Sequence, residues 1–185
     1  ACHLAEHQLR EGFPNIYQHL SDTVLPERRE NSRPSVRDRW WIYGEPRNTF
    51  RPAIVGIQRM LVTSLTASHR VFTFIPSETI ADSTTVLFAL DDASALSVLS
   101  SKIHGTWALA AGGTLEDRPR YNKTLCFDPF PFPDPTEAQK ACLRSLGEQL
   151  DAHRKAQQAA HPKLTLTGMY NVLEKLRAGQ RIEGK

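Results

Sequence analysis

The tract from Asp128 to Pro135 constrains this chain more than any other stretch, because proline occupies every second position from Pro129 onward. Proline has no backbone N–H and its ring fixes the φ angle, so the tract can continue neither a helix nor a central strand. The sequence therefore predicts a stiff connection here. Such a connection holds the residues before it at a fixed place.

The residues before this tract are predicted to be a helix followed by a charged loop. An apolar face with three- and four-residue spacing indicates the helix, and its members are Leu96, Leu99, Ile103, Trp107 and Ala110. The pair Gly112-Gly113 ends it, since glycine readily adopts the left-handed geometry of a helix C-terminus. Residues 114–120 are dense in charge, and Thr124–Phe127 is β-prone. A loop held between a helix and a proline tract suits recognition better than a linker role.

Three groups of residues together resemble one known family. They are residues 39–46 (RWWIYGEP), residues 99–104 (LSSKIH), and residues 120–124 (RYNKT) with 127–133 (FDPFPFP). The combination is similar to the target-recognition domain of MmeI-like type II restriction-modification enzymes, which are large bacterial DNA adenine methyltransferases. The resemblance extends over residues 13–177. The order of strand, proline tract and long helix also resembles the specificity subunits of type I systems.

This resemblance implies where base-reading side chains lie. In the family they follow the helix-ending glycine in a Gly-x-Leu-Glu-x-Arg pattern, which residues 113–118 match. Glu116 and Arg118 are therefore the expected readers, and Ser83 and Thr84 are weaker candidates. Arginine binds guanine bidentately and a carboxylate accepts from cytosine, and side chains two residues apart on an extended backbone point the same way. A surface ion pair between Glu116 and Arg118 is the alternative.

Other polar side chains are expected to hold the DNA backbone, a contact that fixes register without reading sequence. The candidates are Arg120, Tyr121, Asn122, Lys123, Arg59, His69 and Arg70. The stretch from Glu27 to Arg70 contains nine arginines, no lysine and four acidic residues, a net charge of +5. Arginine forks match phosphate oxygens, although a solvated surface with local ion pairs has the same composition.

The hydrophobic patterns predict an α+β fold with a twisted mixed or antiparallel sheet flanked by helices and a C-terminal helical segment. Strands are expected over Arg59–Thr66, Arg70–Ile75 and Thr85–Leu90. Further helices are expected over Pro14–Asn31, from Ser35 through Tyr43, from Thr136 to Pro162 and over Met169–Leu176. We expect three parts: an N-terminal helical segment (1–34), a recognition core (35–134), and a C-terminal helical segment (135–185) that packs on the core or on the rest of a parent protein.

The motifs of a catalytic methyltransferase are missing from this sequence. Such an enzyme needs a glycine-rich loop after a strand for S-adenosylmethionine, and an Asn/Asp-Pro-Pro-aromatic motif for the flipped base. The nearest match, Asp128-Pro129-Phe130, has phenylalanine in place of the second proline, and Gly112-Gly113 follows a helix. We therefore expect no catalytic residue here, and S-adenosylmethionine only in the methyltransferase domain of a parent protein from which this chain is a piece.

Metal, nuclease and membrane roles find no support in the sequence. The seven histidines form no HExxH motif, and Cys2, His3 and His7 at a frayed terminus are the nearest approach to a metal site. Asp91-Asp92 has no PD…ExK partner. Three cysteines without CxxC spacing favour reduced thiols and hence the cytoplasm, and no apolar run approaches the ~20 residues that span a bilayer.

The sequence thus favours a non-catalytic module that recognises a specific double-stranded DNA sequence. Its parent would be a bacterial, cytoplasmic adenine-N6 DNA methyltransferase and restriction-modification enzyme, whose methyltransferase domain is the second expected partner. Two alternatives stay open: a DNA-specificity half-subunit of a type I restriction-modification system, and a structural interaction domain. A nuclease half is a third, weaker one.

Overall fold

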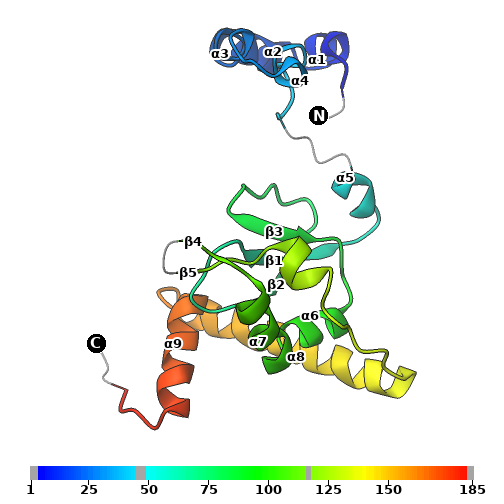
Figure 1. Ribbon diagram of the computed structural model, residues 1–185. Coiled ribbons are helices and arrows are strands. Elements are labelled where there is room, and N and C mark those ends of the chain that lie inside the picture. Colours follow the sequence, from blue (N-terminus) through cyan, green and yellow to red (C-terminus); the bar gives the residue numbers. More distant parts are fainter. Residues whose placement is uncertain (1–3, 45–48, 116–117, 183–185) are drawn as a thin grey trace. The chain divides into compact units, whose positions relative to one another are not determined.

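The structure is a computed structural model that describes residues 4–44, 49–115 and 118–182. The chain divides into two compact units, Ala1–Ala53 and Ile54–Lys185 (Figure 1). This division falls later in the chain than the boundary expected after residue 34, and the C-terminal helices share a unit with the sheet. The α+β class predicted from the sequence is confirmed, with a small antiparallel sheet among helices.

The first unit is helical. Its helices are α1 (Glu6–Gly12), α2 (Pro14–Thr23), α3 (Leu25–Arg29), α4 (Pro34–Arg37) and α5 (Phe50–Ala53). The single helix predicted over Pro14–Asn31 is wrong, because the chain divides it at Val24, next to a proline in the first turn of α3 that cannot donate a helical hydrogen bond. The helix predicted through Tyr43 ends at Arg37, and the turn that follows points Trp40 and Ile42 inward.

Trp40 is buried in the first unit. Its ring centroid lies 5.6 Å from that of Tyr17 and 6.1 Å from that of Trp41. The indole N–H of Trp41 donates to the carbonyl of Leu4 at 2.9 Å. These contacts give both tryptophans a packing role within this unit.

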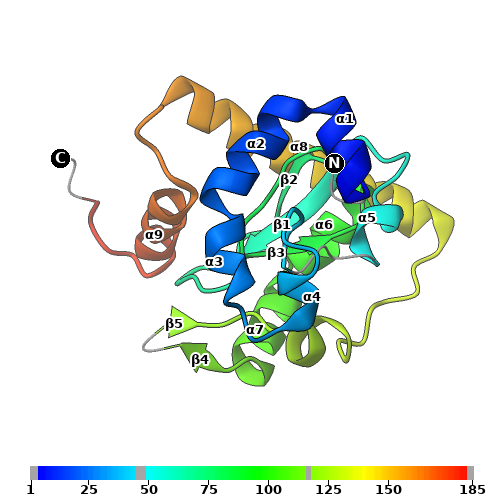
Figure 2. The same ribbon diagram turned by 90° about the horizontal axis from the view of Figure 1, so that it is seen from above.

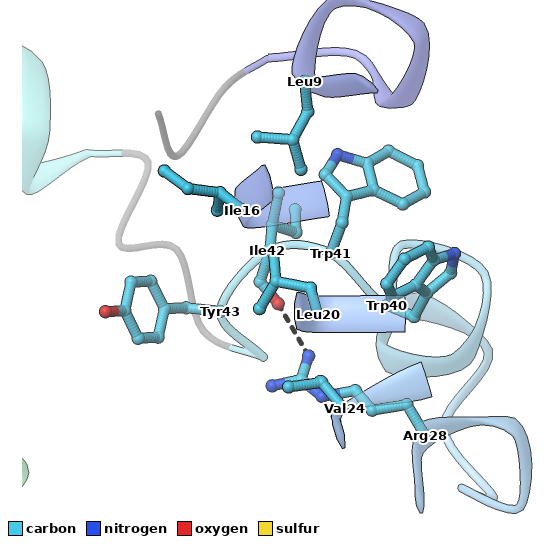
Figure 3. Close-up of a pocket in the computed structure, with 9 residues that line it drawn as sticks. All are labelled: Leu9, Ile16, Leu20, Val24, Arg28, Trp40, Trp41, Ile42 and Tyr43. Carbon is cyan, nitrogen blue, oxygen red and sulfur yellow. Dashed lines mark hydrogen bonds between the residues drawn. The ribbon is translucent and has the colours of Figure 1, made fainter. Parts of the chain in front are cut away.

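An apolar hollow of about 270 Å³ opens beside Trp40 and Trp41 (Figure 3). Aliphatic side chains from α1, α2 and the residues after α4 form most of its wall, and Arg28 supplies the charged group. The Arg28 guanidinium donates to the carbonyl of Ile42 at 2.6 Å, so its charge is engaged by the protein's own backbone. The hollow therefore offers a mainly hydrophobic surface.

The second unit contains a three-stranded antiparallel sheet of order β2-β1-β3, made of β1 (Arg59–Ser64), β2 (Thr73–Pro76) and β3 (Thr85–Phe88). Leu61 on the central strand lies opposite Phe74 on β2 and Phe88 on β3. Met60 and Leu61 are both fully buried although they point to opposite faces, so both faces of β1 are covered. All three predicted strands are present but shorter than expected: β1 ends at Ser64, β2 begins at Thr73 and β3 ends at Phe88. The sheet is antiparallel rather than mixed.

Helices cover one side of this sheet, where Figure 1 shows α6 (Ala93–Leu99), α7 (Lys102–Ala111) and α8 (Glu137–Ala160). The chain continues from α8 into α9 (Leu166–Arg177). The continuous helix predicted from Leu96 to Ala110 is wrong, because it breaks between α6 and α7. The side chain of Ser101 accepts the N–H of His104 at 3.1 Å, and this cap starts the second helix.

Asp92 and Thr136 cap helices as the sequence predicts. Asp92 accepts the N–H of Ser94 at the start of α6. Thr136 and Gln139 form a capping box at the start of α8, and α8 ends at Ala160, two residues before Pro162. No helix in the described part of the chain is long and apolar enough to cross a membrane.

Gly112 ends α7 for a reason other than the one predicted. Its backbone is extended, with φ −74° and ψ 155°, so the left-handed geometry expected there is wrong. A Cβ at this position would lie 2.6 Å from the carbonyl oxygen of Ala108 and 2.6 Å from that of Arg120. Glycine is needed because two backbone segments approach each other here.

The segment Thr124–Phe127 is not a strand. It belongs to a π-helical turn, η1 (Lys123–Phe127). The side chain of Asn122 accepts the N–H of Thr124 at 3.1 Å and its hydroxyl at 2.7 Å, and these bonds start the turn. Cys126 is fully buried in it, so a tertiary contact overrides the β propensity of these residues.

Candidate nucleic-acid interface

Two regions predicted to contact DNA bases meet at one end of the sheet. Leu65, the residue after β1, donates its N–H to the carbonyl of Thr84 at 2.7 Å. Its own carbonyl accepts the N–H of Tyr121 at 2.7 Å. The backbone of Leu65 therefore joins the start of β3 to the segment that contains Arg118.

Arg118 lies on a short β-hairpin, made of β4 (Thr114–Leu115) and β5 (Arg118–Pro119), in which it is opposite Leu115. The hairpin is closed by the N–H of Arg120, which donates to the carbonyl of Gly113 at 2.8 Å. It lies outside the three-stranded sheet (Figure 2). Its residues Thr114, Leu115 and Arg118 are exposed, so this segment is not part of the core.

Glu116, the second predicted base-reading residue, lies outside the described residues, as does Asp117. Arg118 is described and exposed. Within the described ranges, neither the Arg118 nor the Arg120 side chain makes a hydrogen bond or an ion pair with the protein. The hairpin and the residue that follows it, Arg120, therefore present two guanidinium groups whose donors are available to another molecule.

Ser83 and Thr84 are exposed beside the same end of the sheet. The carboxylate of Asp82 accepts the N–H of Thr84 at 2.9 Å and its hydroxyl at 2.7 Å. These hydrogen bonds lower the pKa of Asp82. The Thr84 hydroxyl thus donates its proton to Asp82, and its oxygen can still accept a hydrogen bond from another molecule.

Asn122 and Lys123 follow the hairpin and make local contacts. The Asn122 side chain caps the π-helical turn. Lys123 is exposed and forms an ion pair with Asp128 at 2.7 Å. An exposed pair of this kind contributes little to stability, so the ammonium group of Lys123 can exchange this partner for a phosphate at small cost.

Tyr121 takes a core position. Its side chain is only 1% exposed, and its hydroxyl lies 2.9 Å from Nε2 of His104. Burial raises the pKa of Tyr121 well above its usual value. The predicted contact with the DNA backbone does not fit this position, because the hydroxyl faces the hydrophobic core rather than the surface.

Arg59 is anchored at the other end of β1. It is opposite Pro76, and its guanidinium binds the carboxylate of Glu148 at 2.9 and 2.5 Å and the carbonyl of Asp91 at 3.0 Å. It also stacks over the ring of Phe74 at 3.8 Å. The hydrogen bond with Glu148 raises the pKa of Arg59. Arg59 therefore joins the sheet to α8 and lies away from the hairpin.

His69 and Arg70 are adjacent in sequence, but their side chains bind different parts of the fold. His69 Nε2 lies 2.6 Å from the side-chain oxygen of Asn171, and Nδ1 lies 3.3 Å from that of Glu174, both on α9. Arg70 turns instead to the end of β1 and to the hairpin, where its Nη2 donates to the carbonyl of Pro119 at 3.3 Å. Burial lowers the pKa of Arg70. Both side chains bind the protein itself in this structure.

The arginine-rich stretch from Glu27 to Arg70 belongs to two units of the fold, and its side chains have different partners. Several bind the protein's own acceptors: Arg28 binds the carbonyl of Ile42, and Arg37 pairs with Asp38 at 2.9 Å. Charge counted along the sequence thus overstates the charge available to a partner.

Metal ligands do not gather in the described residues, where no group of three or more histidine, cysteine, aspartate or glutamate side chains could hold an ion. Cys2 and His3 lie outside the described residues, and His7 belongs to α1.

Comparison with known proteins agrees with the resemblance inferred from the sequence. Residues 45–134 match the family described as MmeI, target recognition domain. The fold is similar to part of the Type IIL restriction-modification enzyme MmeI in a structure in complex with DNA, with a TM-score of 0.64 and 22% sequence identity. The match covers 86% of this chain and 21% of that one, so the chain spans about a fifth of the matched protein. No curated protein matches the chain in sequence.

Proposed function

We propose that this chain is a sequence-specific recognition module for double-stranded DNA within a restriction-modification enzyme, and that it is itself non-catalytic. The observation that carries the proposal is the match of residues 45–134 to the MmeI target recognition domain, within which the exposed hairpin places Arg118 free of protein partners. The similar MmeI structure is a complex with DNA.

The geometry of the hairpin supports direct reading of bases. The major groove of duplex DNA is wide enough for a two-stranded β-ribbon, and β4–β5 is such a ribbon with an exposed arginine on it. Arg118 can donate two parallel hydrogen bonds to a guanine. Glu116 and, from the neighbouring start of β3, Ser83 and Thr84 complete the proposed set of readers.

Arg120 and Lys123 are the side chains that we assign to the phosphates. Both are exposed, and they follow the hairpin directly in sequence. Contacts of this kind set the orientation of a protein on the duplex and make binding dependent on salt. Asn122 is a weaker candidate because its oxygen already caps the π-helical turn.

The chemistry of modification lies, in this proposal, in a methyltransferase domain outside the chain. That domain holds S-adenosylmethionine and methylates an adenine that is flipped out of the stack. We place the parent protein in the bacterial cytoplasm, where its DNA substrate and reduced cysteines are found. The full-length sequence tests this part, since a cofactor loop and an Asn-Pro-Pro-aromatic motif must precede the chain.

Selection from a randomised duplex library tests the recognition role. The chain is expected to bind and enrich duplexes that share one short DNA sequence. The logarithm of its DNA-binding constant is expected to fall linearly with the logarithm of the salt concentration. Retention of all sequences equally, or binding that ignores salt, contradicts the proposal and favours a structural interaction domain. A half-subunit of a type I system gives the same enrichment, but its methyltransferase is encoded on another chain.

A further inference from the structure

We infer that Arg70 is a positioning residue, which fixes the β4–β5 hairpin against the end of β1 so that Arg118 is presented in one orientation. The sequence suggested a contact between Arg70 and the DNA backbone, whereas its contacts point into the protein. The consequence for DNA reading rests on the proposed function. The positioning of the hairpin by Arg70 rests only on contacts within this chain.

The guanidinium of Arg70 joins the end of β1 to the segment Pro119–Tyr121, which is far from β1 in the sequence. Its Nη1 donates to the hydroxyl of Thr63 at 3.2 Å and also to the carbonyl of Ser64, both at the end of β1. Its Nη2 donates to the carbonyl of Pro119 on β5. Its carbon atom lies 5.0 Å from the ring centroid of Tyr121. A planar fork with five N–H donors can satisfy such dispersed acceptors at once, whereas lysine cannot.

The hairpin needs this support because it is very short. Each strand has two residues, and an isolated two-stranded hairpin is at best marginally stable in water. Pro119 has no N–H, so its carbonyl is the only hydrogen-bonding group by which its backbone can be held. That carbonyl accepts from two donors, the N–H of Ala67 at 3.3 Å and Arg70.

The surroundings of Arg70 favour a structural role over phosphate binding. Its described partners are neutral oxygens and an aromatic face, and in the described part of the chain no carboxylate forms an ion pair with it. The neighbouring His69 ties the same loop to Asn171 on α9. The loop that contains His69 and Arg70 is therefore attached to α9 through His69, and it is attached to the hairpin through the Arg70 side chain.

Three variants of the whole chain separate the two roles. Arg70→Met removes the fork and keeps much of its length, Arg70→Lys keeps the charge alone, and Arg120→Met is the matched control at an exposed arginine without a protein partner. Each variant is examined by amide hydrogen exchange without DNA, and by library selection together with the salt dependence of binding to a duplex of arbitrary sequence.

Arg70→Met is expected to speed exchange of the Arg120 and Tyr121 amides by about tenfold, since hydrogen bonds to a charged donor are lost. At the base position read by Arg118, the preference for the correct base is expected to fall by about tenfold, because the Arg118 side chain is no longer held in place. The salt slope on arbitrary duplex is expected to stay unchanged. Arg70→Lys gives an intermediate exchange rate with the same slope, which keeps the test valid if Arg70→Met folds poorly.

The control is expected to show the opposite pattern: Arg120→Met lowers the salt slope by about one and leaves the selected sequence intact. If Arg70→Met behaves like this control and its amide exchange is normal, Arg70 contacts phosphate and the inference is wrong, while the proposed function stands. If the unaltered chain selects no sequence, the proposed function fails and the role of Arg70 in DNA reading fails with it. Exchange alone then decides whether Arg70 braces the hairpin.

Discussion

The carboxylate of Asp151 on α8 accepts a hydrogen bond from the backbone N–H of Phe74 at 3.2 Å. Three residues later, Arg154 donates to the carbonyl of Phe72 at 2.8 Å. Phe74 lies on β2, an edge strand of the sheet. Side chains of a helix therefore occupy the hydrogen-bonding positions that a fourth strand would use, and this edge is not open to another chain.

Asp151→Ala should lower the free energy of unfolding by about 2 to 3 kcal/mol, because it leaves the buried N–H of Phe74 and the hydroxyl of Thr73 without an acceptor. Urea denaturation measures the change. Asp128→Ala is the control: it removes only the exposed ion pair with Lys123 and should cost less than about 1 kcal/mol. Equal costs for the two variants would contradict the role assigned to α8.

Stability should depend on pH through His104. This side chain is fully buried, and in the described structure its Nδ1 has no hydrogen-bond partner. Burial lowers the pKa of His104 from 6.5 to about 4. The unfolded chain therefore binds a proton first as pH falls, so stability is complete above about pH 6.5 and declines by up to about 3 kcal/mol toward pH 4.

Urea unfolding between pH 4.5 and pH 7 measures this dependence, with His104→Leu as the reference, since leucine removes the titrating group. The variant should show a flatter profile in this window. Asp92 and Glu148, whose pKa values are lowered by hydrogen bonds from their arginine partners, add their own losses mainly at lower pH. Parallel profiles for the two proteins would mean that His104 is not buried in its neutral form.

Replacing Gly147 and Gly105 by alanine should change the stability of the protein in opposite directions. Gly147 on α8 faces α6, and a Cβ there would lie 2.1 Å from the carbonyl oxygen of Ala93. Gly147→Ala forces the helices apart and should cost about 1 to 3 kcal/mol. Gly105 on α7 has no atom within 4 Å of such a Cβ, so Gly105→Ala should stabilise the helix by about 0.5 to 1 kcal/mol. Thermal melting compares them, and a neutral Gly147→Ala argues against the close helix contact.

Arg118→Ala should change which base is accepted at one position of the selected DNA sequence. Loss of a bidentate arginine–guanine contact costs about 1 to 3 kcal/mol of discrimination at that position. Lys123→Ala is the control: it should weaken binding to all sequences alike and flatten the salt dependence. Library selection reads both effects. An unchanged preference in Arg118→Ala shows that another residue reads the base.

Local signals in the sequence predicted two helix caps and the approximate places of three strands, but they missed the breaks before α3 and α7 and the π-helical turn η1. Asp92 and Thr136 cap α6 and α8 because the N–H groups that they accept lie two and three residues away. The positions of the three strands followed from apolar patterning. The target-recognition resemblance came from short motifs and matches residues 45–134. In both caps the interacting groups are close together along the chain.

The partners of long side chains were not predictable in this way. Arg59 binds Glu148, 89 residues away, and Arg70 binds Pro119, 49 residues away. Tyr121 matched a surface motif, yet it packs against Phe72 with ring centroids 5.4 Å apart. A basic or aromatic residue has the same appearance in a sequence whether it faces a phosphate or the protein itself.

The amino-acid sequence by itself determined the α+β class, the caps of α6 and α8 and the candidate readers on the segment around Arg118, because these depend on residues that are neighbours in the chain. Only the tertiary structure decided which cations remain available to a partner. Arg118 and Arg120 stay without protein partners in the described structure, while Arg59 and Arg70 are engaged. The reason is physical: an arginine donates to whichever acceptors the fold brings within about 3 Å, and distant segments supply those acceptors only after the chain has folded.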